Sequence, residues 1–184
     1  MINLRENYKK AIPALKEKYK NVMSIPKITK VVVNTGLGKL TMGGTSGENK
    51  KIFESVINDL SLICGQKVVL TKARKSIAAY KTRTGMPIGA KVTLRGPKMY
   101  DFLERVINIA LPRSRDFQGI NFKSLDGAGN LTIPIKEHII FPEIMAENTK
   151  IVFGFEITVV TSAKNKEDGL ELLRLLQFPI KKDK

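Results

Sequence analysis

The chain of 184 residues contains no tryptophan, one cysteine (Cys64) and one histidine (His138). A single cysteine excludes an internal disulfide and any cysteine-based metal cluster. A histidine-dependent dyad or metal site needs further convergent groups, and none accompany His138 in the sequence. We therefore expect Cys64 to be a buried core thiol, His138 to be structural, and the protein to need neither metal nor cofactor.

Long apolar runs are also missing. No run approaches 18 residues, so we expect no transmembrane helix and no membrane partner. Residues 1–7 lack the apolar core of a secretory signal. Together with the low cysteine content, these features predict a reducing, cytoplasmic location.

Acidic residues are absent from the window 67–98, although the whole chain has a net charge of +15. Surfaces selected only for solubility usually mix both signs of charge. A fixed positive surface of this kind suits a polyanionic partner, and nucleic acid is the leading candidate. The basic residues of the window are Lys67, Lys72, Arg74, Lys75, Lys81, Arg83, Lys91, Arg95 and Lys98.

The length and the 42% of hydrophobic residues predict one domain over residues 1–184 with a sizeable core. Apolar residues at helical spacing predict helices over 3–20, 48–64, 97–111 and 165–177. The first belongs to a basic N-terminal region, 1–25, and Pro13 should kink or split it. Ser46 is a candidate N-cap of the second helix, and Gly65 should end it.

Strands are predicted over 27–35, 67–71, 87–95 and 150–161, mostly with one apolar face. That pattern favours an α+β fold with a mostly antiparallel sheet, helices packed on one face, and an open basic face. In the third strand, Lys91, Thr93 and Arg95 share the polar side. Residues 39–47 read as a loop, and 72–86 and 112–134 as mobile loops.

Three short motifs fail as chemical signatures. Gly36 and Gly38 follow a strand, but Thr41 occupies the position where a dinucleotide-binding turn needs a third glycine. Gly38 and Gly43 have phosphate-loop spacing, but Gly44 stands where the essential lysine belongs. The segment 153–155 (FGF) resembles a fragment of an RNA-recognition motif without its flanking residues, so core packing is favoured for both phenylalanines.

The loop 73–85 is more informative, because its charges are mixed with serine, threonine and Tyr80. Such groups hydrogen-bond phosphate and sugar or stack on a base. RNA contact is favoured over an exposed turn with incidental charge. The residues concerned are Arg74, Lys75, Tyr80, Lys81 and Arg83.

Five blocks, in order, resemble the bacterial-type large-subunit ribosomal protein five family, whose members bind 5S rRNA. The resemblance covers nearly the whole chain. The blocks are 26–34 (PKITKVVVN), 60–76 (LSLICGQKVVLTKARKS), 85–96 (GMPIGAKVTLRG), 115–119 (RDFQG) and 135–144 (IKEHIIFPEI).

The resemblance implies a structural constituent of the large ribosomal subunit that binds 5S rRNA and helps attach it in the central protuberance, beside 23S-type rRNA and other proteins there. The loop 73–85 would reach the peptidyl-site tRNA. The near-neutral segment 101–147 would meet small-subunit ribosomal protein thirteen in an intersubunit bridge. The resemblance places rRNA contacts on Thr29, Lys30, Asn34, Gln66, Lys67, Thr71, Lys91, Thr93 and Arg95.

The chain departs from the family pattern at Thr84, where an acidic residue is expected, and over 145–155 and 176–180. A bacterial cytosol and an organelle matrix both fit the sequence. Two other functions stay open: a small enzyme with an anion pocket, suggested by the incomplete phosphate loop, and a module that grips an acidic protein. The resemblance implies no catalysis.

Overall fold

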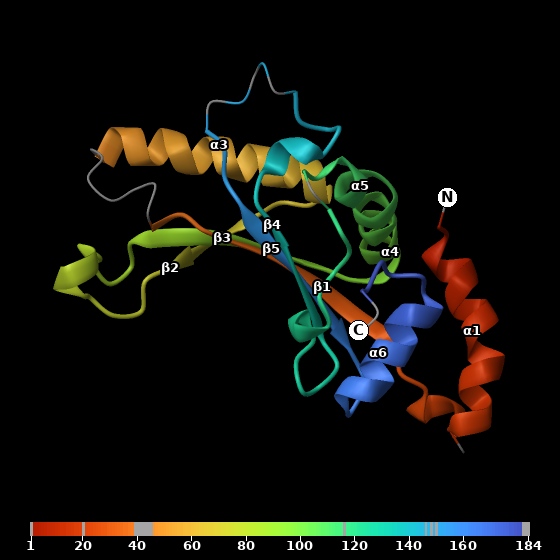
Figure 1. Cartoon of the computed structure of the whole chain (residues 1–184). Coiled ribbons are helices and arrows are strands. Elements are labelled where there is room, and N and C mark those ends of the chain that lie inside the picture. The colour runs from red at the N-terminus through yellow and green to blue at the C-terminus, as the bar shows by residue number, and fades with distance from the viewer. Residues whose placement is uncertain are drawn as a thin grey trace. The chain divides into compact units, whose positions relative to one another are not determined.

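The structure is a computed structural model that describes residues 2–19, 21–38, 46–115, 117–145, 147, 149 and 151–181, with only the backbone for 46–48. Its helices are α1 (Leu4–Lys18), α3 (Ser46–Cys64), α4 (Gly96–Arg105), α5 (Leu111–Arg113) and α6 (Lys166–Leu175) (Figure 1). Its strands are β1 (Ile28–Gly36), β2 (Val69–Lys72), β3 (Pro87–Leu94), β4 (Leu131–Ile135) and β5 (Phe155–Thr161).

The five strands form one sheet in the order β2-β3-β1-β5-β4. Strands β2 and β3 pair antiparallel, with Val69 opposite Lys91 and Thr71 opposite Gly89. The predicted α+β fold with a mostly antiparallel sheet is confirmed. The order also brings β1 beside β5, which lies more than a hundred residues later in the chain.

The chain divides into two compact units. Unit 1 comprises Met1–Val31, Leu94–Ile133 and Thr158–Lys184, and unit 2 comprises Val32–Thr93 and Pro134–Ile157. The organisation as a single domain stays a prediction.

Unit 2 is built around α3, which runs alongside β3 (Figure 1). Its apolar stripe is buried, including Phe53, Val56, Leu60 and Ile63, and Cys64 is buried as predicted. Gly65 adopts a left-handed conformation (φ +62°), which glycine tolerates without strain, and the helix ends there as predicted. Ser46 lies inside the helix, so its prediction as the N-cap is wrong.

In unit 1, α1 packs against α4 and α6. The Glu104 carboxylate accepts a hydrogen bond from the Leu4 backbone N–H at 2.9 Å, at the first turn of α1. Pro13 does not split this helix, contrary to one expected outcome. The proline and Lys9, whose carbonyl loses its helical donor, are both exposed, so water can satisfy that carbonyl.

Strand β4 begins within the region predicted as the loop 112–134 and ends one residue beyond it. Leu131, Ile133 and Ile135 are buried in alternation. Pro134 removes a backbone donor from this strand, and proline is tolerated on a sheet edge, where β4 lies. The proline and the Gly/Asn-rich residues before it conceal the strand in the sequence.

The helix predicted over 97–111 continues to Arg113 through a π-helical segment, Val106–Ala110. There the Leu111 N–H donates to the carbonyl of Val106. Such a widened turn accommodates Pro112, which has no N–H and would clash with the preceding turn of a regular α-helix.

Two strand boundaries also differ from prediction. The strand expected over 67–71 begins at Val69, and the strand expected over 150–161 begins at Phe155. Most of the predicted loop 39–47, including the phosphate-loop spacing, lies outside the described residues, as does 182–184. Within the described residues, no helix is both long and apolar enough for a membrane span.

Candidate nucleic-acid interface

The sheet strands of unit 2 present one polar side. Residues opposite each other in an antiparallel pair point to the same side, so Val69 and Thr71 share a side with Lys91. Lys91 is exposed and Thr93 half-buried, whereas the alternate residues Ala90 and Val92 are buried. Strand alternation therefore places the polar residues of β3 opposite its buried apolar residues.

Strand β1 continues this side of the sheet. From Val31 onward its burial alternates, with Val33 and Thr35 buried and Asn34 exposed. Glu156 of β5 is exposed between the buried Phe155 and Ile157. We call this side of unit 2 the polar face; it comprises Val32, Asn34, Gly36, Val69, Thr71, Gly89, Lys91, Thr93 and Glu156.

Two further predicted residues lie between α3 and β2. The left-handed turn at Gly65 redirects the chain, and Gln66 and Lys67 follow it, both exposed. The Gln66 Nε2 donates a hydrogen bond to the Thr93 carbonyl at 3.2 Å, which ties this turn to the end of β3. Gln66 and Lys67 thus border the polar face.

The other predicted rRNA residues belong to unit 1. Thr29 and Lys30 are half-buried on β1, and the Thr29 hydroxyl donates to the carbonyl of Val160 at 3.0 Å. Arg95 is exposed and immediately precedes α4. The structure therefore assigns the predicted set to both units, with six of its nine residues in unit 2.

Residues 73–86, which we call the basic loop, form a hydrogen-bonded hairpin. At its base, the Ala73 N–H donates to the Met86 carbonyl at 2.8 Å, and the Gly85 N–H donates to the Ala73 carbonyl at 3.0 Å. Further out, Ile77 and Thr82 form an antiparallel bridge. The Ser76 Oγ accepts from the Thr84 N–H at 3.0 Å, and the two hydroxyl oxygens lie 3.1 Å apart.

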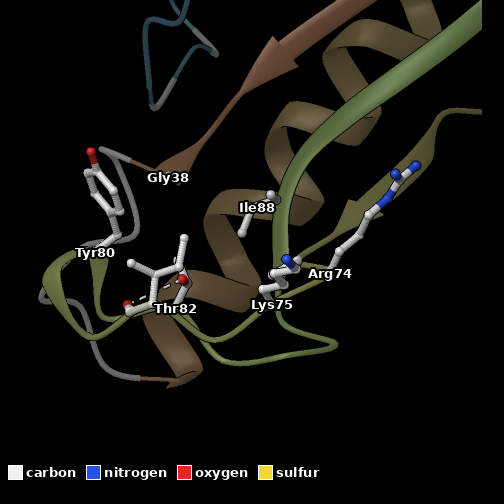
Figure 2. Close-up of a pocket in the computed structure, with 8 residues that line it drawn as sticks. Gly38, Arg74, Lys75, Tyr80, Thr82 and Ile88 are labelled. Atoms are coloured by element: carbon white, nitrogen blue, oxygen red, sulfur yellow. Dashed lines mark hydrogen bonds between the residues drawn. The ribbon is translucent and has the colours of Figure 1, made fainter.

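Every side chain that the family resemblance assigns to tRNA contact is exposed on the basic loop: Arg74, Lys75, Tyr80, Lys81 and Arg83. A cavity of about 580 Å³ lies against the loop, lined by Ala73, Ile77, Ile88 and others. In Figure 2, Tyr80 and Arg74 lie on opposite sides of Ile88. The loop therefore offers separate cationic and aromatic groups.

His138 and both phenylalanines of 153–155 are core residues, as predicted. His138 is fully buried, and its ring stacks on Phe153 with centroids 4.1 Å apart. Its Nδ1 accepts a 3.4 Å hydrogen bond from the Phe153 N–H, and its Nε2 lies 3.6 Å from Asp59 Oδ2. Burial lowers the pKa of His138 and raises that of Asp59.

Two family models together match nearly the whole chain. The model described as ribosomal protein L5 matches residues 21–83, and the model that describes the C-terminus of the same ribosomal protein family matches residues 87–180. The chain belongs to the ribosomal protein L5 family. Membership accounts for the five sequence blocks and for the basic surface together.

Named members of this family are similar to the chain over nearly their full length. The large ribosomal subunit protein uL5 of Desulforapulum autotrophicum is 52% identical, over 98% of this chain and 99% of its own. The protein of the same name from Halothermothrix orenii is 51% identical over 96% and 97%. That from Spiroplasma kunkelii is 50% identical over 98% and 99%.

As an L5-family member, the chain is a structural constituent of the large ribosomal subunit and not an enzyme. Its relatives are bacterial, and their ribosomes are cytoplasmic. The enzyme hypothesis therefore falls. In the described residues, no group of three or more His, Cys, Asp or Glu side chains is placed to hold a metal ion.

The sequence interpretation did not include Glu156, which the structure places on the polar face. The alternation of β5 places Glu156 on the polar side of its strand. Which residues of other strands lie near it depends on the order of strands in the sheet, which puts β1 beside β5. Glu156 and Asn34 line one pocket of about 280 Å³, together with Gly36 and Pro134. No pattern within β5 could have shown that pairing.

Proposed function

We propose that this chain binds 5S rRNA through the polar face of unit 2 and helps attach it in the central protuberance of the large subunit. The observation that carries the proposal is the grouping of Asn34, Lys91 and Thr93 on one accessible side of the sheet, bordered by Gln66 and Lys67. Thr29, Lys30 and Arg95 extend the proposed contacts to unit 1.

These groups suit RNA chemically. Lysine contacts phosphate without reading sequence, whereas amides and hydroxyls hydrogen-bond 2′-hydroxyls and the edges of exposed bases. Thr71 and Thr93 are half-buried on the polar face, so their hydroxyls are held by the strands instead of moving freely. Recognition would then rest on Asn34, Gln66 and the threonines, and affinity largely on the lysines.

The basic loop is the proposed contact with the peptidyl-site tRNA. Its hairpin hydrogen bonds hold four cationic side chains on one short segment: Arg74, Lys75, Lys81 and Arg83. Tyr80, 60% exposed, can stack on a base. Thr84, in place of an acidic residue, leaves this positive charge uncompensated.

The segment 101–147 is proposed to meet small-subunit ribosomal protein thirteen in an intersubunit bridge. It carries five basic and seven acidic residues, in contrast to the window 67–98. A segment with this charge balance is better suited to contact another protein than to contact the phosphate backbone of RNA. Contacts with 23S-type rRNA and other central-protuberance proteins belong to the same proposal.

The test is binding of the purified protein to 5S rRNA and to a scrambled RNA of equal length, across a salt series. With roughly 6–10 phosphate contacts, both affinities should fall by orders of magnitude between low and moderate salt. A preference for 5S rRNA of about a hundredfold (about 2.7 kcal/mol) that survives added salt supports the proposal. Equal affinities that vanish together refute it.

A further inference from the structure

The polar face contains one group that its proposed role does not explain, the carboxylate of Glu156. Glu156 lies on β5, the neighbour of β1 in the sheet, and lines one pocket together with Asn34 of β1. A carboxylate on a face that meets phosphates repels them and weakens binding. If the face binds RNA, a favourable contact between Glu156 and the RNA must offset this repulsion. The residues around Glu156 indicate which group of the RNA could make that contact.

The surroundings form a small pocket of about 280 Å³, entirely within unit 2. Its lining residues come from β1, from the end of β4, from the start of β5 and from the residue just before β5: Asn34, Thr35, Gly36, Pro134, Ile135, Gly154, Phe155 and Glu156. The volume lies just below the usual range for ligand pockets, about 300–1,000 Å³, which suits a group no larger than a single planar base.

The pocket is held open by two glycines and one buried threonine. The Thr35 hydroxyl donates to the Gly154 carbonyl at 2.7 Å. A Cβ on Gly154 would lie 2.9 Å from the Ile135 carbonyl oxygen, so a side chain is excluded there. A Cβ on Gly36 would meet no atom within 4 Å, which shows that this position faces open space.

Two polar side chains of the pocket have no partner within the described residues. Across the described residues, the side chains of Asn34 and Glu156 make no hydrogen bond or ion pair. An ionised carboxylate only accepts hydrogen bonds, and can accept two in parallel, whereas the Asn34 amide both donates and accepts. Exposed Pro134 adds an apolar wall.

We propose that this pocket binds an unstacked guanine base of the RNA, with Glu156 as the residue that determines specificity. Guanine presents two adjacent donors, N1–H and the N2 amino group, on its Watson–Crick edge, and these match the two oxygens of one carboxylate. Its O6 acceptor suits the Asn34 amide. Adenine, cytosine and uracil each place an acceptor where guanine has a donor, so a carboxylate rejects them.

The inference rests on the proposed RNA-binding function. It predicts that Glu156 strengthens the binding of RNA, whereas charge repulsion alone predicts that Glu156 weakens it. Replacing Glu156 by glutamine removes a negative charge, which should tighten binding to every RNA alike. If the carboxylate holds guanine, the same replacement weakens binding to RNA that offers the base. Glu54→Gln is the matched control, since Glu54 is an exposed carboxylate on α3, outside the polar face.

The experiment uses the full chain and four heptanucleotides of RNA, each with three uridines on both sides of a central guanosine, inosine, adenosine or cytidine. The wild type should bind the guanosine heptamer about tenfold more tightly than the adenosine and cytidine heptamers, as expected for hydrogen bonds to a charged group. Inosine lacks the N2 amino group and should fall between them. Glu156→Gln should lose the preference, and Glu54→Gln should keep it.

Gly36→Val provides a second route that does not alter charge. Valine favours strands, and nothing within 4 Å obstructs its Cβ, so the variant should fold while its side chain fills the pocket. It should also lose the guanosine preference. A wild type that binds all four heptamers equally overturns the inference, and so does a preference that survives in either variant.

The 5S rRNA measurement separates the two failures. If the proposed function is wrong, the wild type binds 5S rRNA no better than the scrambled RNA. If only the guanine pocket is wrong, the wild type and Glu156→Gln prefer 5S rRNA to the same extent.

Discussion

Thr35 on β1 and Gly154, just before β5, are joined by a hydrogen bond from the threonine hydroxyl to the glycine carbonyl, 2.7 Å long. Thr35 is only 2% exposed, so this polar side chain is buried. A buried hydroxyl needs a partner to offset its desolvation. The bond provides that partner and fixes the backbone at the edge of the pocket.

Thr35→Val should therefore destabilise the fold by about 1 kcal/mol, because valine has nearly the same shape but leaves the Gly154 carbonyl without its donor. The free energy of unfolding in urea measures the effect. Thr158→Val is a control, since the Thr158 hydroxyl is half-buried and lies 3.5 Å from that of Thr132, too far for a strong bond. An equal loss in both variants would contradict the role given to Thr35.

Gly89→Ala should destabilise the fold more strongly. A Cβ on Gly89 would lie 2.5 Å from the Thr35 carbonyl oxygen and 2.9 Å from the Thr71 hydroxyl, so β1 or β3 must shift. Overpacking of this kind costs about 1–3 kcal/mol. Gly36→Ala is the matched control, because its Cβ meets nothing within 4 Å. Urea unfolding should show a large loss for Gly89→Ala and almost none for the control.

The stability of the fold should decrease as pH falls below about 7. Burial lowers the pKa of His138 in the folded state beneath 6.5, its value in an unfolded chain. The unfolded state then binds the proton more readily, so stability is fully present above 6.5 and is lost as pH falls toward the folded-state pKa. Urea unfolding at pH 7.5 and pH 5.5 measures this loss.

His138→Phe should reduce this pH dependence while keeping an aromatic ring against Phe153. Asp59, whose pKa is raised mainly by burial, acts in the opposite direction, because protonation of its carboxyl is favoured in the folded state. A slope between pH 7.5 and 5.5 that is the same in both proteins would mean that His138 does not titrate with unfolding.

Ser76→Ala should loosen the basic loop without affecting the sheet. The Ser76 Oγ accepts a hydrogen bond from the Thr84 N–H and lies beside the Thr84 hydroxyl. Ser76 therefore joins the two arms of the hairpin. Hydrogen exchange should become faster at Thr84 and Lys81 but stay unchanged in β3. Unchanged exchange at Thr84 would show that other bonds suffice to hold the loop.

The elements that sequence could predict are those whose pattern is local. The apolar stripe of α3 and the stop at Gly65 lie within one segment, and so does the alternation of β3 around Lys91. Core packing of Phe153 is also predictable, because it shares the apolar side of an alternating segment, whereas His138 is predicted only to be structural. These features depend on the period of a helix or strand, which a single sequence contains.

The missed features depend on distant or non-standard partners. The π-helical turn before Pro112 is defined by hydrogen bonds five residues apart and has no distinct apolar period. Strand β4 is masked by Pro134, which only its edge position makes acceptable. Glu156 and Asn34 line one pocket because β5 lies beside β1 in the sheet, and no local pattern encodes which strands are neighbours.

Two variants of the proposed rRNA surface should separate affinity from recognition. Lys67→Ala removes an exposed charge beside the polar face, so it should weaken binding to all RNAs alike and reduce the salt slope by about one. Asn34→Ala removes an amide that can read a base or a 2′-hydroxyl, so it should lower the preference for 5S rRNA while leaving the salt slope unchanged. Both are measured by titration against 5S rRNA and a scrambled RNA at several salt concentrations. Because Asn34 carries no charge, an equal loss on both RNAs would refute its role in recognition, and a loss confined to 5S rRNA in Lys67→Ala would show that this lysine reads a specific feature of the RNA.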